Sequence, residues 1–191
     1  HTGGKKEMSL MIASDLHGSA LFCRDLLSRF AAEGCAELLL LGDILYHGPR
    51  NDLPEGYAPK QVVALLNAMS EKILCVRGNC DAEVDEMVLS FPFAQDTLAL
   101  EREGLHLLAA HGHHTGPQQP VPAGACSVFL FGHTHIPFRK KIGGVWYLNP
   151  GSISIPKEGS ARGYMTLDAS GFQWKTLQGE TYDALPLEAL Q

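Results

Sequence analysis

Short apolar runs that alternate with helical patterns constrain the fold of this chain more than any other feature. The runs cover residues 8–13, 38–41 and 73–76, and apolar residues at helical spacing fill 20–32 and 62–69 between them. Runs this short and this apolar are typical of buried parallel strands, and the helices between them are the usual crossovers. The first half of the chain therefore predicts a βαβαβ unit within an α/β fold.

Strand patterns dominate the second half of the chain. They cover residues 97–100, 105–110, 128–131, 138–142, 145–148, 164–167 and 172–176. Two of them flank Gly143-Gly144, which indicates a hairpin. We expect one domain over residues 8–185, because a chain of 191 residues suits a single core. Residues 1–7 precede the first Met and match no strand pattern, so we interpret them as an expression-tag remnant.

Five apolar runs end in residues that can bind metals. The five clusters are Asp15-x-His17, Gly42-Asp43, Gly78-Asn79, His111-Gly112-His113 and Gly132-His133-x-His135. Ligands of open α/β sheets bind beyond the carboxyl ends of the strands, so adjacent strands would bring these clusters together. Any one of these residues alone could be a cap or a turn residue. Their joint placement at five strand ends favours a metal site.

Spacing and ligand type refine this prediction. Residues two apart in an extended segment point the same way, so Asp15 with His17, and His133 with His135, can each converge on one ion. The set mixes carboxylate, imidazole and amide oxygen without thiolate, which favours Mn, Fe, Zn, Co or Ni over Ca or Mg alone. Seven side chains exceed the needs of one ion and suit two ions that share one carboxylate, with Asp43 as the natural bridge. Two such ions, two aspartates and a bridging hydroxide leave a small positive charge that matches a phosphodiester monoanion.

Charge and cysteine content limit the partners and the compartment. The formal net charge is −6 and no basic stripe occurs, which argues against stable nucleic-acid binding. A small anionic substrate stays compatible, since bound metal ions reverse the local charge. The five cysteines form no CxxC motif and favour a reducing, cytoplasmic location. No apolar run approaches the ~20 residues of a membrane span, and a symmetric homodimer is the default assembly.

The ordered set of motifs also includes Leu41-Gly42-Asp43, Arg77-Gly78-Asn79-Cys80-Asp81 and Asn149-Pro150-Gly151-Ser152. From Met8 to Lys157 this set resembles the calcineurin-like metallophosphoesterases, and within them the small bacterial and archaeal YfcE-type phosphodiesterases. The resemblance implies an α/β fold of four αββα layers, in which two mixed β-sheets are packed between outer helices. That expectation agrees with a βαβαβ half followed by strand-rich sequence.

The resemblance also implies a role for each ligand. Asp15, His17 and His135 would hold one divalent ion, Asn79, His111 and His133 would hold the other, and Asp43 would bridge them. Mn is the expected metal, with Ni, Co, Fe or Zn as alternatives. A metal-bridging hydroxide would attack the phosphorus of a small phosphodiester in line, and both ions would stabilise the developing charge.

Cys80 departs from the pattern of many metallophosphatases, which have Gly-Asn-His where this chain has Gly78-Asn79-Cys80. A thiol is a weak hydrogen-bond donor and cannot replace the cationic donor that a protonated His offers. We therefore predict a catalytic Cys80 and a preference for diesters with good leaving groups. The alternative is that Cys80 is only small and packed. Asp81 is expected to orient a neighbouring ligand.

Each of several polar residues near the motifs could have either of two roles. His113 and His114 could touch substrate or lie exposed in a loop. Arg50, in the polar loop with His47 and Asn51, could pair with a phosphate oxygen or serve as plain surface.

Two rival functions use the same fold. One is a phosphomonoesterase or nucleotide phosphatase with the same metal site. The other is a protein-binding scaffold like the retromer subunit that has this fold with a degraded metal site. The presence of all seven ligand positions argues against the scaffold, while fold alone would not separate these functions. The natural substrate is not predicted, because loops 46–59 and 112–124 shape the pocket.

Overall fold

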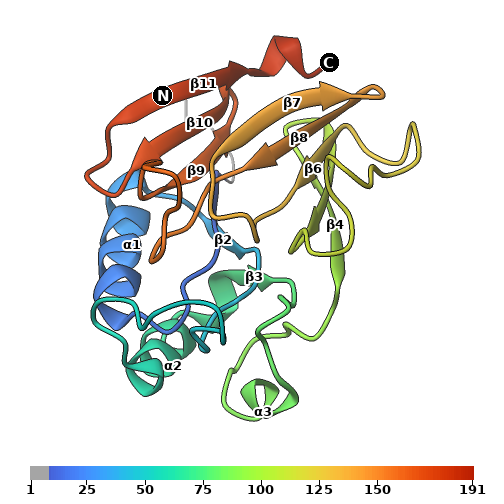
Figure 1. Ribbon diagram of the computed structural model, residues 1–191. Coiled ribbons are helices and arrows are strands. Elements are labelled where there is room, and N and C mark those ends of the chain that lie inside the picture. Colours follow the sequence, from blue (N-terminus) through green and yellow to red (C-terminus); the bar gives the residue numbers. More distant parts are fainter. Residues whose placement is uncertain (1–8) are drawn as a thin grey trace.

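Two mixed β-sheets face each other in the computed structural model, which describes residues 9–191 (Figure 1). The six-stranded sheet has the order β11 (Thr181–Pro186), β10 (Gly171–Thr176), β9 (Gly163–Asp168), β1 (Leu10–Ala13), β2 (Glu37–Leu40) and β3 (Ile73–Cys75). The five-stranded sheet has the order β4 (Thr97–Arg102), β5 (Leu105–Ala110), β6 (Val128–Leu130), β8 (Val145–Asn149) and β7 (Phe138–Ile142). The predicted expression-tag remnant at residues 1–7 lies outside the described residues.

Each sheet contains three neighbouring parallel strands. β1, β2 and β3 are parallel in the first sheet, and β5, β6 and β8 are parallel in the second. The remaining strands pair antiparallel, through the contacts of β9 with β1 and of β4 with β5 among others. The carboxyl ends of the parallel strands therefore open toward one edge of the two-sheet core, where the predicted metal ligands follow them.

Helices α1 (Ala20–Glu33) and α2 (Pro59–Asn67) cover the outer face of the six-stranded sheet (Figure 1). The hydroxyl of Ser19 caps α1 by accepting a hydrogen bond from the Phe22 N–H at 3.2 Å, and Gly34 ends the helix with a φ of 67°. A proline at the first position of α2 suits a helix start. Residues 9–191 also form a short helix α3 (Glu83–Glu86) and two 3₁₀ turns, Ser70–Lys72 and Leu187–Ala189.

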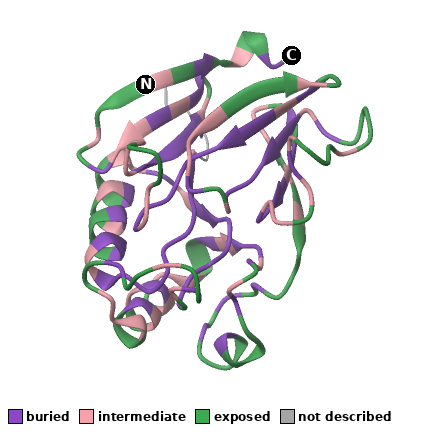
Figure 2. Cartoon of the chain, viewed as in Figure 1, coloured by how far each residue is buried: buried purple, intermediate pink, exposed green. Residues whose placement is uncertain are grey.

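Strand β1 lies between two parts of the core, in a chain whose buried residues are coloured purple in Figure 2. Leu10 and Ile12 pack in the cluster that contains the inner residues of the five-stranded sheet, such as Leu107. Met11 and Ala13 pack in the cluster that contains the helices. All four β1 side chains are fully buried, which explains why this strand reads as a continuous apolar run.

A loop rather than a helix covers the outer face of the five-stranded sheet within residues 9–191. Phe129 and Tyr147 are fully buried on that face, and Val121 of the loop donates its N–H to the Tyr147 hydroxyl at 2.9 Å. The predicted α/β class, with two mixed β-sheets and helices packed outside, is confirmed. Within the same residues, no helix is both long and apolar enough to cross a membrane.

Two elements carry no pattern that predicts them. β11 (Thr181–Pro186) is an edge strand whose residues are mostly exposed, so it lacks the apolar alternation of a half-buried strand. α3 (Glu83–Glu86) has a single turn, too short for a helical period to show. The strands and helices that the sequence predicts are all present, with ends shifted by a few residues.

Candidate metal centre

The predicted ligands lie in the loops that follow five parallel strands. Asp15 and His17 follow β1, Asp43 follows β2, Asn79 follows β3, His111 follows β5, and His133 and His135 follow β6. Short loops hold them in place, and most of these side chains are buried although they are polar. Buried polar groups are normally paired with a partner, so the contacts of each donor atom decide what this site can bind.

One group of donors contains Asp15, His17 and His135. The Oδ1 atom of Asp15 lies 3.2 Å from Nε2 of His135 and 3.5 Å from Nε2 of His17. The two imidazole Nε2 atoms are 3.2 Å apart. Three donor atoms therefore converge on one point, which suits a single cation.

A second group contains Asp43, His111 and His133. The Oδ2 atom of Asp43 lies 3.2 Å from Nε2 of His111, and that nitrogen lies 3.3 Å from Nδ1 of His133. The amide oxygen of Asn79 joins this group at 3.0 Å from Nδ1 of His133. Because Oδ2 of Asp43 is also 3.6 Å from Nε2 of His17, the Asp43 carboxylate lies between the two groups.

The two-residue spacings do not act as expected. His133 and His135 fall into different groups and do not converge on one point, which corrects the prediction from their spacing. Asp15 and His17 do share a group, but neither is extended, since their φ angles are 58° and 46°. The rule for extended segments therefore does not apply to either pair.

Left-handed backbone is concentrated at this site. Seven non-glycine residues within 9–191 have positive φ, and five of them are predicted ligands: Asp15, His17, Asp43, His133 and His135. Such conformations are uncommon and cost on the order of 1–3 kcal/mol each, so the surrounding structure must enforce them. Gly78 lets its backbone approach Asp43 closely, because a Cβ atom at this position would overlap the Asp43 carboxylate.

Backbone carbonyls orient three of the imidazoles. The Nδ1 atoms lie within hydrogen-bond distance of a carbonyl oxygen for His17 with Tyr46 at 2.8 Å, His111 with Leu41 at 2.6 Å, and His135 with Ile155 at 2.7 Å. An Nδ1–H that donates to a carbonyl leaves the Nε2 lone pair free and fixes the ring. This is the arrangement that metal-ligating histidines adopt.

Asp81 ties two of the ligand loops together. Its Oδ2 atom accepts hydrogen bonds from the N–H groups of Asp43 at 2.8 Å and Gly78 at 2.7 Å, and its Oδ1 atom accepts from Ile44 at 2.9 Å. Burial raises the pKa of Asp81 in spite of these three bonds. The carboxylate therefore faces backbone groups and links the loops that carry Asp43 and Asn79.

Arg162 holds the segment that orients His135, and no sequence motif revealed this contact. Its Nη1 atom donates to the carbonyls of Ile153 at 2.7 Å and Ser154 at 2.9 Å. The next carbonyl, that of Ile155, accepts from His135. Because these contacts run through backbone atoms, no residue type in this segment signals them.

The charges of the site fit a divalent cation. The Oδ1 atom of Asp15 is buried and faces the Nε2 atoms of His135, His17 and His111. Burial alone would raise the pKa of Asp15, but hydrogen bonds to His135 and His17 hold it well below its usual range. Burial would lower the pKa of His111, but the carboxylates of Asp43 and Asp15 raise it to about 9. Two buried carboxylates thus attract positive charge, which divalent metal ions would supply.

Cys80 lies at the edge of the centre. Its Sγ atom can form a donor group with His17 and Asp43, and its N–H donates to Oδ1 of Asp43 at 2.9 Å. Burial and the Asp43 carboxylate raise the pKa of the Cys80 thiol to about 12. The thiol therefore stays protonated and uncharged at neutral pH.

Two pockets border the centre and are lined by residues for which the sequence leaves two interpretations open. A cleft of about 390 Å³ is lined by Arg50 and Asn51, and also by Lys157, which the sequence did not single out. A larger pocket is lined by His113 and His114. His47 lines neither pocket.

Comparison with known proteins agrees with this geometry. A family model described as the calcineurin-like phosphoesterase superfamily domain matches residues 8–171. Phosphodiesterase YfcE of Escherichia coli (strain K12) is 45% identical over 161 residues, which cover 84% of this chain and 88% of YfcE. Probable metallophosphoesterase YsnB of Bacillus subtilis (strain 168) is 27% identical over 168 residues, which cover 84% of this chain and 83% of YsnB.

A solved structure of the same relative also matches the fold of this chain. The structure of YfcE, described as a phosphoesterase from E. coli, matches with a TM-score of 0.89 at 42% identity. The match covers 94% of this chain and 100% of that chain. The predicted resemblance and the two-sheet fold are thus both confirmed.

Proposed function

This chain belongs to the calcineurin-like phosphoesterase superfamily, and on that premise we propose that it hydrolyses a small phosphodiester with two divalent metal ions. The domain responsible spans residues 8–185 in this proposal. Manganese is the expected metal, with nickel, cobalt, iron or zinc as alternatives, because the donors are imidazoles, carboxylates and one amide oxygen.

The position of the Asp43 carboxylate carries the proposal. It lies between two groups of donors, at 3.2 Å from Nε2 of His111 and 3.6 Å from Nε2 of His17. A carboxylate has two oxygens and can be shared by two cations, whereas a neutral side chain in this place could not balance their charge. This arrangement supports a two-ion site with Asp43 as the bridge.

The residues of the chain divide the work of the site. When bound, two divalent ions would activate a water for in-line attack and stabilise the charge that develops on the phosphate. Asp15 and Asp43 supply the negative charge that holds the ions. Arg50 and Lys157 line the adjacent cleft, where their cations would attract and orient an anionic ester.

Cys80 supports a diester rather than a monoester substrate. An uncharged thiol cannot protonate a poor leaving group as a cationic imidazole would, and a diester with a good leaving group needs this help least. Cys80→His should therefore raise turnover at near-neutral pH on a diester with a poor leaving group. Cys80→Ser, which keeps a neutral donor, is the matched control. Equal turnover in wild type and Cys80→His would remove this support.

A metal-refilling assay tests the proposed function. The protein is stripped of metal, refilled with Mn, Ni, Co, Zn or Mg, and assayed on an aryl diester and the matching aryl monoester. We expect hydrolysis that depends on the metal and is faster with the diester. Faster hydrolysis of the monoester would indicate a phosphomonoesterase, and no hydrolysis with any metal would indicate a protein-binding scaffold.

Asp43→Asn tests the bridging role directly. A neutral amide balances two cations poorly, so this variant should lose most of the activity and the affinity for the second ion. Asp52→Asn alters an exposed aspartate in the following loop and is the matched control. Normal rates in Asp43→Asn would refute the bridge.

The compartment and the assembly follow from simpler features. The five cysteines are free, which supports a reducing, cytoplasmic location. We expect no nucleic-acid or membrane partner, and a symmetric homodimer is the assembly to test by light scattering.

A further inference from the structure

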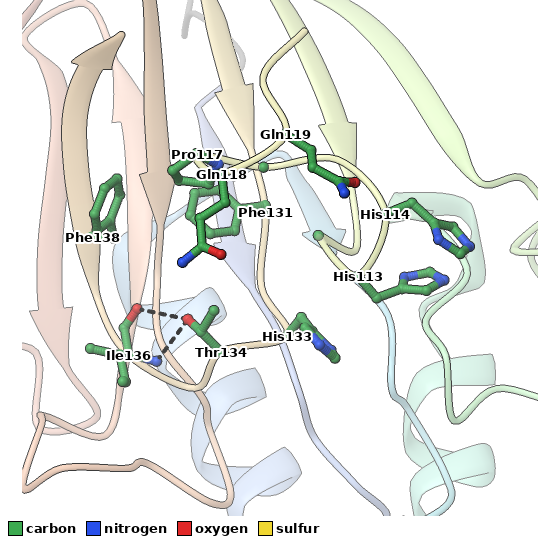
Figure 3. Close-up of a pocket in the computed structure, with 12 residues that line it drawn as sticks. His113, His114, Pro117, Gln118, Gln119, Phe131, His133, Thr134, Ile136 and Phe138 are labelled. Atoms are coloured by element: carbon green, nitrogen blue, oxygen red, sulfur yellow. Dashed lines mark hydrogen bonds between the residues drawn. The ribbon is translucent and has the colours of Figure 1, made fainter.

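A pocket of about 570 Å³ lies beside the metal centre, between the loop after β5 and the segment after β6 (Figure 3). Its size falls in the range of small-molecule sites, roughly 300–1,000 Å³. The proposed function uses the cleft on the other side of His133 and gives this pocket no role. His133 lines both spaces, so a ligand phosphate at the metal centre would border the pocket directly.

The wall formed by the segment after β6 is apolar and aromatic. Phe131, Ile136 and Phe138 line it, and the rings of Phe131 and Phe138 meet edge to face with their centroids 5.9 Å apart. Phe131 is buried, while Ile136 and Phe138 are half-buried, so part of this surface is open to the pocket. Aromatic and branched side chains of this kind bind flat, uncharged rings.

The opposite rim is formed by a tight turn that carries two amides. Backbone hydrogen bonds between Gly116 and Gln119, at 3.2 and 3.0 Å, hold this turn in shape. Gln118 and Gln119 are exposed and line the pocket, and in Figure 3 the amide of Gln118 extends into it above Thr134. Each amide can both donate and accept a hydrogen bond, which matches the polar edge of a heterocyclic ring.

The two spaces beside His133 differ in charge. The cleft contains Arg50 and Lys157, whereas no Lys, Arg, Asp or Glu lines the pocket among residues 9–191. A phosphodiester carries two organic groups, and at this centre one would extend into each space. The pocket suits the group that is uncharged, planar and hydrogen-bonding.

We propose that this pocket binds the nucleobase of a nucleotide-type phosphodiester. This inference rests on the proposed phosphodiesterase function, which supplies the metal-bound phosphate that anchors the ligand. The base stacks on the half-buried ring of Phe138, which the buried ring of Phe131 supports edge to face, and the amides of Gln118 and Gln119 contact its edge. The pocket thus determines which diester is chosen and takes no part in the chemical step.

A comparison of two diesters tests the proposal on the metal-loaded protein. The substrates are the trifluoroethyl esters of AMP and of ribose phosphate, which share an activated leaving group and differ by the base, and hydrolysis is followed by phosphorus NMR. The readout is the ratio of kcat/KM for the two esters. We expect wild type to favour the AMP ester by about tenfold or more, which corresponds to about 1.4 kcal/mol.

Two variants address the two sides of the pocket. Phe138→Ala removes a stacking ring, and the double variant Gln118→Ala/Gln119→Ala removes the amides from exposed positions where folding is not at risk. Each should lower the ratio to about threefold or less. Ile142→Ala removes a side chain from the same strand but outside the pocket, and it should keep the wild-type ratio.

The outcomes separate this inference from the proposed function. Hydrolysis of both esters without a preference, or a preference that survives both variants, would overturn the base pocket and leave the phosphodiesterase intact. Failure to hydrolyse either ester with any metal would count against the proposed function. Calorimetric titration with AMP and with ribose phosphate then decides the pocket on its own. AMP binding that is tighter by tenfold and weakened by both variants supports it, and equal binding overturns it.

Discussion

Asp81→Asn should loosen the two loops that carry Asp43 and Asn79. In the wild type the carboxylate accepts hydrogen bonds from the N–H groups of Asp43, Gly78 and Ile44 at 2.8, 2.7 and 2.9 Å. Asparagine has nearly the same shape but only one accepting oxygen. At least one of the three N–H groups therefore loses its partner in a buried place.

The size of the effect follows from these contacts. If the amide oxygen of the asparagine keeps the hydrogen bonds from the N–H groups of Asp43 and Gly78, two charged hydrogen bonds become neutral ones, at a loss of roughly 1 kcal/mol each. Loss of the hydrogen bond from the Ile44 N–H costs roughly 1.5–3 kcal/mol. Burial raises the pKa of Asp81, so the charged form carries a desolvation cost that the amide avoids, which offsets part of the loss. We expect the free energy of unfolding to fall by about 2–3 kcal/mol.

Urea unfolding of the metal-stripped proteins measures this loss, with the fluorescence of Trp146 and Trp174 as the signal. Asp52→Asn, at an exposed position, is the control and should stay within about 0.5 kcal/mol of wild type. A chelator competition should also show a loss of metal affinity of about 10–100-fold, because the ligand loops are no longer held. Wild-type stability together with wild-type metal affinity in Asp81→Asn would refute the positioning role.

Three further predictions concern the rest of the molecule. Arg162→Gln should weaken metal binding by about tenfold, since it frees the segment whose carbonyl orients His135, and a chelator competition checks this. Burial alone would raise the pKa of Glu33, but hydrogen bonds from Lys175 and Tyr164 lower it below its usual value. Its stabilising contribution is therefore present above about pH 4.3 and lost as pH falls through the folded pKa, and Glu33→Gln should flatten stability against pH in that window. Removal of metal by a chelator should lower Tm by about 5–10 °C, because ligands at a hundredfold excess over Kd add about 2.7 kcal/mol.

The fold class and the set of residues at the centre could be read from the sequence for one physical reason. Parallel strands buried on both faces are continuous apolar runs, and their carboxyl ends are marked by the polar residues that follow. Asp15, Asp43 and His111 stand out because residues that can bind metals follow five such runs in one chain. Residue type and position along the chain were enough to bring these side chains to one edge.

The partition of the ligands could not be read in the same way. Whether His133 and His135 join one group or two depends on their φ angles of 66° and 62°, and an extended segment would have given another answer. Contacts made by backbone atoms, such as the carbonyl of Ile155 that orients His135, carry no signal in the side-chain sequence. The edge strand β11 (Thr181–Pro186) could not be predicted either, because little of it is buried and its sequence therefore lacks apolar alternation.

The left-handed backbone at the centre has a consequence for protein engineering. Asp15, Asp43 and His133 project toward one another only because their peptide units turn in a way that most residues avoid, and Gly78 leaves the space for that turn. A graft of the seven side chains onto the strand ends of another α/β protein would therefore place them in the wrong directions. The transplantable unit is the set of loops with their glycines and with the Asp81 crosslink, and a minimal synthetic version of this centre has to begin from those loops.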